Sequence, residues 1–189
     1  MSRILGVAPG KAGFFGRLVY RMATKRYGVL MEPLAVARHH KGVFYTYGLH
    51  ELMAERVSTV LPKSVRELAV YRAAVRLGCE WCIDFGTMLQ RLDGLDVERL
   101  REIDDYATSP KFSNEERLAI AYADAMTATP VHVTDEQVAE LVSAFGEKGV
   151  IELTYQISLE NMRARFNSAL GITEQGFSSG DACRVPLTR

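Results

Sequence analysis

Two cysteines three residues apart are the side chains of this sequence whose types and spacing best support chemistry. Cys79 and Cys82 stand in the segment LGCEWCIDFG, directly after Gly78, a residue that can end one helix and admit the next. If a helix begins there, both sulfurs share one face, and the free N–H groups and dipole of the helix terminus stabilise a thiolate. A second thiol one turn away can then convert an oxidised sulfur into a disulfide that a reductant resets. The spacing therefore predicts redox chemistry.

Two other uses of the cysteine pair stay open. The same spacing is half of a zinc site, but structural zinc usually needs four ligands. The remaining candidates, Cys183 and four histidines, form no second pair with ligand spacing, so we expect no metal and no other cofactor. The two cysteines can also be buried and inert, because free cysteine often packs as a small hydrophobic residue. Cys183 lies in a tail rich in small and polar residues, where we expect no role for it.

A carboxylate precedes the pair by twelve residues. Glu67 lies in SVRELAVYRAAVRLG, whose apolar spacing predicts a helix, and two antiparallel helices joined at Gly78 would bring it beside the thiols. There it could accept and return the proton that a cysteine loses and regains. Ser64 and Glu67 also fit the S-x-x-E capping box, so the carboxylate could instead cap its own helix. The sequence leaves both roles open.

The hydrophobic pattern of the chain is helical. Apolar residues recur with a spacing near 3.6, whereas the alternation of half-buried strands does not persist, so we predict an all-α, single-domain helical bundle. Ser113 and Thr134, each followed by Glu or Gln three residues later, mark two helix starts. Gly146 and Gly149 are suitable stop signals. The expected helices cover about residues 14–27, 34–57, 62–77, 79–92, 97–106, 114–129, 135–145 and 151–170.

Length and composition exclude several classes of protein. A chain of 189 residues suggests one domain with a sizeable core. Its 23 basic and 23 acidic residues give zero net charge, which argues against a generic nucleic-acid partner. We find no apolar run near the ~18 residues of a membrane span and no signal peptide, so we expect a cytoplasmic protein without a membrane partner. Three cysteines also argue against a secreted disulfide framework.

The charge is unevenly distributed, and we divide the chain into a basic N-terminal arm at residues 1–33, a helical core at 34–175 and a tail at 176–189. The first thirty residues carry six Lys or Arg and no acid, interleaved with apolar residues such as Phe14 and Leu18. This arm can form a membrane-surface helix. We prefer the interpretation that it packs on the core or on a neighbouring subunit, which needs no lipid.

Glu67, eleven intervening residues and the helix start Cys79-Glu80-Trp81-Cys82 resemble the core of the carboxymuconolactone decarboxylase and alkylhydroperoxidase D superfamily. The segment ENMRARFNSALGI is also similar, and the resemblance spans residues 34–172. It implies an alkylhydroperoxidase D-like helical fold, a homo-oligomer of three or six subunits, and peroxiredoxin-type reduction of a hydroperoxide. Cys82 would attack the peroxide and Cys79 would resolve it, with a dithiol such as a lipoyl donor as reductant. Position at the helix start favours Cys79 as the first nucleophile instead; we follow the resemblance.

The sequence departs from the family where its well-studied peroxidases carry histidine. Gly86 stands four residues after Cys82, and Trp81 stands where some members have a second histidine. Without an imidazole, no group that titrates near neutrality links Glu67 to the thiols unless another residue or water replaces it. Members that decarboxylate a muconolactone lack the thiol pair, which argues against that activity here. Histidines elsewhere that could fold over the site are His39, His40 and His50.

Further charged residues near the motif are less informative. Asp84 lies two residues after Cys82, and its charge would oppose thiolate formation. Asn161, Arg163 and Arg165 could orient Glu67 or bind an anionic substrate, although ion pairs are the commoner use of such arginines.

The leading hypothesis is a hydroperoxide reductase. The alternatives are a thiol–disulfide oxidoreductase or redox sensor, which the glycine at position 86 favours, and a catalytically inert oligomeric member of the family.

Overall fold

The computed structural model describes residues 2–178, and every regular element within them is helical. The all-α prediction is therefore confirmed. Cys183 and most of the expected tail lie outside the described residues. The elements are η1 (Pro9–Lys11), α1 (Gly13–Tyr27), α2 (Glu32–Ala37), α3 (Lys41–Val57), α4 (Lys63–Arg76), α5 (Glu80–Leu92), η2 (Glu98–Asp105), α6 (Asn114–Thr127) and α7 (Asp135–Leu170).

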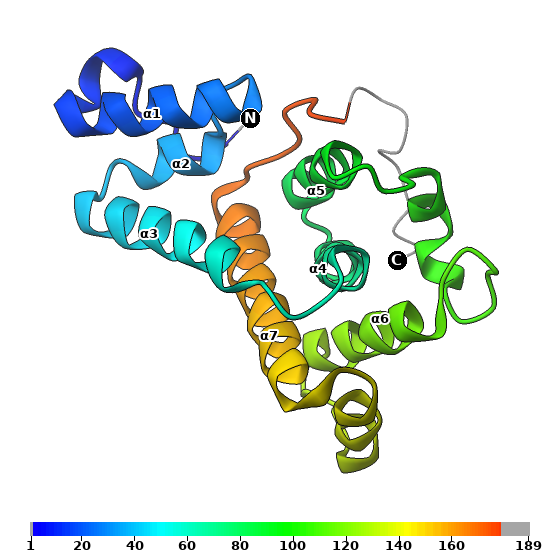
Figure 1. The fold of residues 1–189 in the computed structure, drawn as a ribbon. Helices are drawn as coiled ribbons and strands as arrows, with labels where there is room; N and C mark the ends of the chain where they lie inside the picture. Colours follow the sequence, from blue (N-terminus) through cyan, green and yellow to red (C-terminus); the bar gives the residue numbers. More distant parts are fainter. Residues whose placement is uncertain (1, 179–189) are drawn as a thin grey trace.

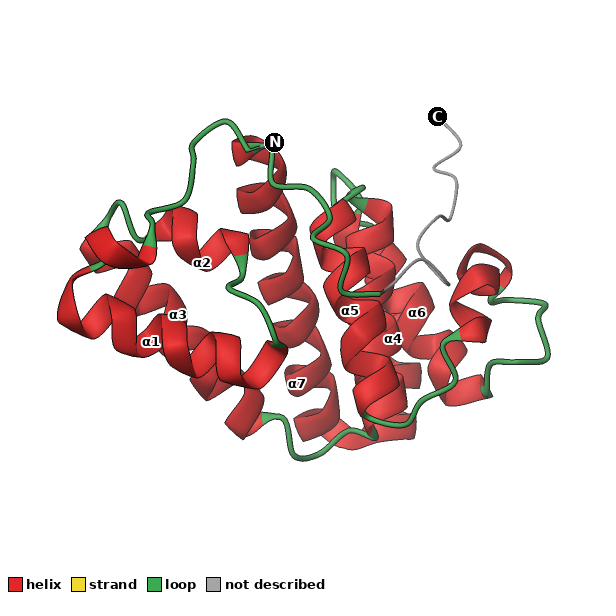
Figure 2. Ribbon diagram, turned by 90° about the horizontal axis from the view of Figure 1, so that it is seen from above, coloured by secondary structure: helices red, strands yellow, loops and turns green. Residues whose placement is uncertain are grey.

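Helix α7 runs through the middle of the molecule. Helices α4, α5 and α6 lie on one side of it, and α1, α2 and α3 lie on the other (Figures 1 and 2). Helix α4 contacts α5, α6 and α7, so it is the hub of the core. The apolar spacing that predicts α4, α6 and α7 supplies this core: its fully buried residues include Ala69, Ala73, Ala119, Ala123, Leu141, Leu153 and Ile157.

Two helix boundaries differ from the sequence prediction. The helix expected over residues 34–57 is broken, because His40 caps a new helix: its Nδ1 accepts the N–H of Val43 at 3.1 Å. Arg38, at the break, donates to the carbonyl oxygen of Ala12 through Nε at 3.0 Å and Nη2 at 2.6 Å. The segment expected as a helix at 97–106 forms the tighter 3₁₀ helix η2. At the break before α3, polar side-chain contacts thus override the apolar period.

The caps expected at Ser113 and Thr134 are confirmed, whereas Gly149, expected as a stop signal, lies inside α7. Ser113 forms the full capping box with Glu116, with bonds of 3.2 and 2.9 Å. Thr134 accepts the N–H of Gln137 at 3.2 Å and starts α7. Gly146, at φ +68° and ψ 167°, interrupts α7, so the two helices expected around it are separate helical stretches in one element. A positive φ of this kind is strained for any residue with a Cβ.

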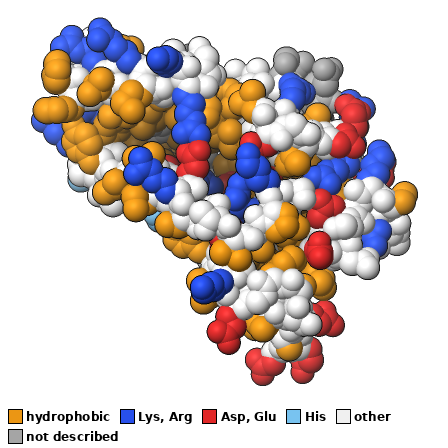
Figure 3. Space-filling model, viewed as in Figure 1, with side chains coloured by type: hydrophobic (Ala, Val, Ile, Leu, Met, Phe, Trp, Pro, Cys, Tyr) orange, Lys and Arg blue, Asp and Glu red, His pale blue; other side chains and the backbone are white. Residues whose placement is uncertain are grey.

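The basic arm packs against α2 and α3. Tyr20 on α1 lies against Phe44 on α3, with ring centroids 6.2 Å apart, and its hydroxyl donates to the carbonyl oxygen of Val7 at 3.0 Å. The outer face of the arm is exposed and apolar, and Figure 3 shows hydrophobic side chains gathered over the α1–α3 side of the molecule. No helix in residues 2–178 is both long and apolar enough to cross a membrane. The exposed apolar residues include Phe14, Phe15, Leu18, Met22, Val43, Leu49, Leu52 and Met53.

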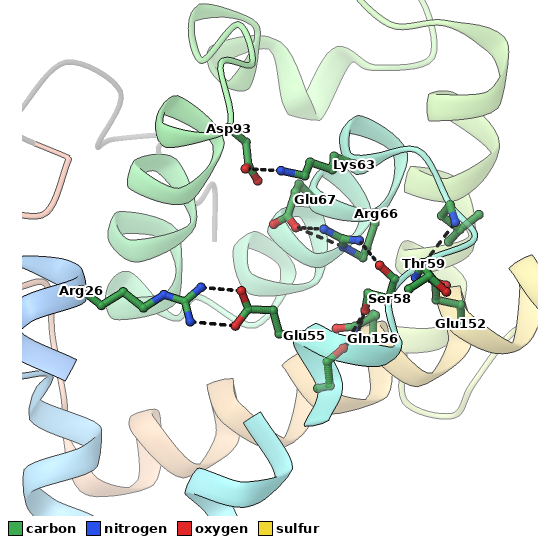
Figure 4. Close-up of polar contacts among 12 residues, drawn as sticks. Arg26, Glu55, Ser58, Thr59, Lys63, Arg66, Glu67, Asp93, Glu152 and Gln156 are labelled. Atoms are coloured by element: carbon green, nitrogen blue, oxygen red, sulfur yellow. Dashed lines mark hydrogen bonds and ion pairs between the residues drawn. The ribbon is translucent and has the colours of Figure 1, made fainter. Parts of the chain in front are cut away.

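The linker between α3 and α4 is fixed to α7 by one carboxylate. Glu152 accepts the backbone N–H groups of Thr59, Val60 and Leu61 at 3.0, 2.8 and 3.3 Å (Figure 4). Gln156, one turn further along α7, donates to the Ser58 hydroxyl at 2.5 Å. These bonds satisfy linker N–H groups that have no helical partner. They also set the start of α4, which carries Glu67 and leads to the cysteines.

Candidate active site

The two cysteines occupy the start of α5 and are joined by a disulfide. Cys79 is the residue that caps the helix, and its Sγ accepts the N–H of Cys82 at 3.3 Å. Gly78 permits the reversal from α4, because its φ of +64° lies in the left-handed region that favours glycine. The Cα atoms of the pair are 5.3 Å apart. The sulfurs therefore lie at the positive end of a helix, as their spacing predicts.

The disulfide is almost enclosed by protein. Cys79 and Cys82 are 2% and 7% exposed and pack among apolar side chains from α2, α4, α7 and the segment that follows α7. One polar side chain enters this apolar shell. Asn167 of α7 is 0% exposed, and its Nδ2 lies 3.5 Å from Cys82 Sγ and 3.8 Å from Cys79 Sγ. The apolar members of the shell are Val36, Ala74, Trp81, Ala164 and Ile172.

The segment at residues 172–178, which we call the covering segment, runs from the end of α7 alongside α5 (Figures 1 and 2). Asp84 holds it in place. Its carboxylate accepts the backbone N–H groups of Gln175, Phe177 and Ser178 at 2.9, 3.0 and 2.7 Å, and also the Ser178 hydroxyl. Burial by itself would raise the pKa of Asp84, but these hydrogen bonds outweigh it and lower that pKa below its usual value. Asp84 thus anchors the covering segment.

An aromatic cluster continues the cover over the disulfide. Trp81 stacks on Phe85 at a centroid distance of 4.7 Å and meets the edge of Phe177 at 5.9 Å. The indole Nε1 donates to Gln175 Oε1 at 2.8 Å, and the same oxygen accepts the N–H of Glu32 at 2.7 Å. Trp81, at the family's second histidine position, therefore links α5 to the covering segment and contributes no titrating group.

Glu67 is held by its neighbour in the chain. Its Oε1 accepts from Arg66 Nε and Nη2 at 3.1 and 2.9 Å, and both side chains are largely buried (Figure 4). The capping alternative is wrong: α4 begins after Pro62 without a side-chain cap, because the Ser64 hydroxyl bonds to Glu116 instead. Within residues 2–178, no hydrogen bond joins Glu67 to either sulfur.

The position of Glu67 along α4 explains this separation. Ala74, which packs against the disulfide, lies seven residues after Glu67 on the same helix face. Two helical turns correspond to about 10 Å along the axis. Glu67 is thus on the α4 face that leads to the pair, and a proton passing between them needs an intermediate group.

The three candidate histidines make their contacts elsewhere. His39 Nε2 bonds to the carbonyl of Leu5 at 2.9 Å, and His40 caps α3. His50 lies against the ring of Tyr155, with centroids 5.7 Å apart. A Cβ at Gly86 would sit 3.4 Å from Cδ2 of Tyr71, so the Tyr71 ring borders the family's usual histidine position. Among residues 2–178, no three metal-binding side chains gather into a possible metal site.

Comparison with known proteins identifies the family. The sequence profile of the Carboxymuconolactone decarboxylase family matches residues 45–125. The chain is also 34% identical over 165 residues to YnjA of Escherichia coli K12, an uncharacterized protein. This match covers 87% of the chain and 88% of YnjA. The chain belongs to the carboxymuconolactone decarboxylase family. A shorter match, 32% identical over 89 residues, joins 47% of the chain to 26% of the alkyl hydroperoxide reductase Rv2159c of Mycobacterium tuberculosis.

Solved structures share the fold. An uncharacterized peroxidase-related protein with an alkylhydroperoxidase AhpD core, from Ralstonia eutropha JMP134, has a TM-score of 0.83 and 12% identity, with 94% of each chain covered. The debrominase Bmp8 has a TM-score of 0.81 and 17% identity, covering 93% of this chain and 94% of its own. The AhpD-like fold is therefore shown, and it carries more than one chemistry.

Glu160 and Asn167 of α7 are buried polar residues that no sequence motif identified. Glu160 is 3% exposed, and burial raises its pKa to about 7; attraction to Arg163 opposes the rise. Repulsion from Glu51 and Glu67 adds to it. Both lie on the buried face of α7. A polar residue at a position where the helical period predicts an apolar one is the sequence signal that could have identified them. Arg163 makes the expected ion pair with Glu51 and also donates to Glu160 Oε2 at 3.3 Å.

Proposed function

We propose that this protein is a thiol-dependent hydroperoxide reductase of the peroxiredoxin type, with Cys82 and Cys79 as its redox pair. The observation that carries the proposal is the disulfide at the start of α5, formed by two sulfurs that accept hydrogen bonds. A helix N-terminus and N–H donors both stabilise a thiolate, which is the form that attacks a peroxide. The family and the similarity to an alkyl hydroperoxide reductase support the same activity.

The proposed cycle uses each sulfur once. The Cys82 thiolate attacks the terminal oxygen of a hydroperoxide, the O–O bond breaks, and the alkoxide takes a proton and leaves as an alcohol. The Cys79 thiolate then attacks the sulfenic acid of Cys82, forming the disulfide and releasing hydroxide, which a proton converts to water. The larger exposed fraction of Cys82 supports this order. A dithiol, such as a lipoyl donor, reduces the pair and becomes a disulfide itself.

We assign the proton transfer to Glu67, acting through an intermediate group because of its distance along α4. Glu160, whose charge is repelled by that of Glu67, is buried and has a pKa raised to about 7. A group with that pKa exchanges protons near neutrality, as the family's histidine does. Glu160 is thus the best candidate for part of the role that Gly86 leaves unfilled.

The proposal also covers the oligomeric state and the cellular location of the enzyme. We propose a homo-oligomer, with three or six subunits as the family resemblance implies, since the exposed apolar side chains of α1 and α3 suit burial between subunits. We place it in the cytoplasm, where thiol reductants keep cysteine pairs reducible. The domain boundaries at 33 and 175 remain a prediction.

Peroxide turnover tests the proposal. The reduced protein is mixed with cumene hydroperoxide and dihydrolipoamide, and consumption of each is followed at pH 7. We expect Cys82→Ser to abolish turnover, and Cys79→Ser to stop after one equivalent of peroxide, with a trapped sulfenic acid on Cys82. Ser113→Ala, which changes only the start of α6, is the control for the effect of substitution itself. Unchanged turnover in both cysteine variants contradicts the proposal.

The second candidate is a thiol–disulfide oxidoreductase or redox sensor. The absence of histidine at position 86 favours it, because exchange with a partner thiol does not require the proton relay of a peroxidase. In this case the pair reacts with a disulfide substrate, and Cys79→Ser captures a protein as a mixed disulfide, while peroxide is not consumed catalytically.

A further inference from the structure

The amide of Asn167 is placed against both reacting sulfurs. Its Nδ2 lies 3.5 Å from Cys82 Sγ and 3.8 Å from Cys79 Sγ, and the side chain is 0% exposed. Asn167 comes from α7, 85 residues after Cys82, so only helix packing brings it to the pair. An amide nitrogen carries two hydrogens, and it can therefore serve either sulfur as a donor.

The other end of the same amide lacks a partner. Asn167 Oδ1 is buried and accepts no hydrogen bond from any described residue. Leaving a buried polar atom unpaired costs about 1–3 kcal/mol. A hydrophobic residue of the same size would avoid this cost in the apolar shell formed by Ala164, Ala74 and Ile172. The position therefore carries a polar side chain that the oxidised pair does not fully use.

The reduced cysteine pair can supply the hydrogen-bond donor that Asn167 Oδ1 lacks. Two electrons and one proton convert the disulfide into one thiolate and one thiol, so the site then holds one strong acceptor and one S–H donor. A disulfide sulfur is a weak acceptor and has no hydrogen to give. The amide of asparagine offers one donor end and one acceptor end, which is the complement of a thiolate and a thiol side by side.

We propose that Asn167 is a catalytic residue that stabilises the reduced cysteine pair, with Nδ2 donating to the thiolate and Oδ1 accepting from the remaining thiol. The proposal rests on the redox function proposed above and names a residue for it. Breaking the S–S bond lets the sulfurs move apart, and a small rotation of the amide or of one cysteine brings Oδ1 to the S–H. Asn167 then replaces the missing histidine as a thiolate-stabilising group, although it cannot carry a proton.

The consequence is a pair that is easier to reduce. A group that stabilises the reduced form more than the disulfide raises the reduction potential, and a donor to the thiolate lowers the pKa of the thiol. Both effects are properties of the cysteines alone, and neither requires a peroxide.

The test compares four proteins in thiol titration and in redox equilibrium with glutathione. Asn167→Leu removes both ends of the amide at nearly constant volume, and Asn167→Asp replaces the donor by a charge that repels a thiolate. Asn161→Leu is the matched control, because its Nδ2 on the same helix bonds to Thr127 and not to sulfur. Thiolate formation is followed by its ultraviolet absorbance from pH 4 to 10, and the fraction of disulfide is measured in glutathione buffers.

We expect Asn167→Leu to shift the glutathione equilibrium about tenfold toward the disulfide, which corresponds to about 30 mV, and to raise the thiol pKa. Asn167→Asp should shift both further, and the Asn161→Leu control should match the wild type. If Asn167→Leu does not fold, Asn167→Ser, which keeps a smaller donor and acceptor, should lie between the wild type and Asn167→Asp. Equal equilibria and titrations in the wild type and the Asn167 variants overturn the proposal. Absence of peroxide turnover in the wild type, with these shifts present, refutes the hydroperoxide reductase and leaves the role of Asn167 intact.

Discussion

The buried carboxyl of Glu160 makes the stability of the fold depend on pH in an unusual direction. Burial raises its pKa from 4.5 to about 7, so between these values the folded state holds a proton that the unfolded chain releases. Stability is therefore fully present below pH 4.5 and is lost as the pH rises through 7. A paired surface carboxylate has the opposite dependence.

The size of the effect follows from the shift itself. At 1.36 kcal/mol per pKa unit, a rise from 4.5 to about 7 corresponds to a loss of about 3 kcal/mol between pH 4.5 and 8. Glu160→Gln replaces the carboxyl by a neutral amide of similar shape. We expect this variant to equal the wild type near pH 5 and to become more stable than it by about 3 kcal/mol near pH 8.

Urea unfolding at pH 5, 6, 7 and 8 measures the difference. The control Glu140→Gln makes the same chemical change at an exposed position of the same helix. Subtracting the variant from the wild type removes the contributions of all other titrating groups, because these are shared. A Glu160→Gln difference that does not grow between pH 5 and pH 8 refutes the assignment of a neutral, buried Glu160.

Three further predictions concern the elements around the site. Asp84→Asn weakens the anchor of the covering segment, and we expect a loss of about 2 kcal/mol in urea unfolding together with faster labelling of the reduced cysteines by a thiol reagent. Gly149→Ala places a Cβ 2.7 Å from Phe145 Cβ, and we expect a loss of about 1–3 kcal/mol by the same measurement. Ser113→Ala removes the hydroxyl that accepts the N–H of Glu116 and should cost about 1 kcal/mol, with thiol reactivity unchanged. Unchanged labelling in the first, or unchanged stability in the others, contradicts the corresponding contact.

Much of the helical pattern was readable along the chain. The capping box at Ser113, the cap at Thr134 and the interruption at Gly146 involve residues within a few positions of one another, and local hydrogen bonds are enough to specify them. The helix starting at the cysteines belongs to the same class, because Gly78 and the N–H of Cys82 are local. The break at His40 was missed, since a histidine cap is an uncommon signal that competes with a continuous apolar period.

The chain's order of residues was sufficient for the helical class, the family and the position of the thiol pair, because helix periodicity and caps act over three or four residues. The surroundings of the pair depend on packing between distant segments: Asn167 reaches the sulfurs from α7, and Asp84 collects N–H groups from residues more than ninety positions away. No local sequence pattern specifies such contacts between distant residues. They are set by which helix faces bury together, and polar groups inside a core gain their roles, and their shifted pKa values, from the partners found there.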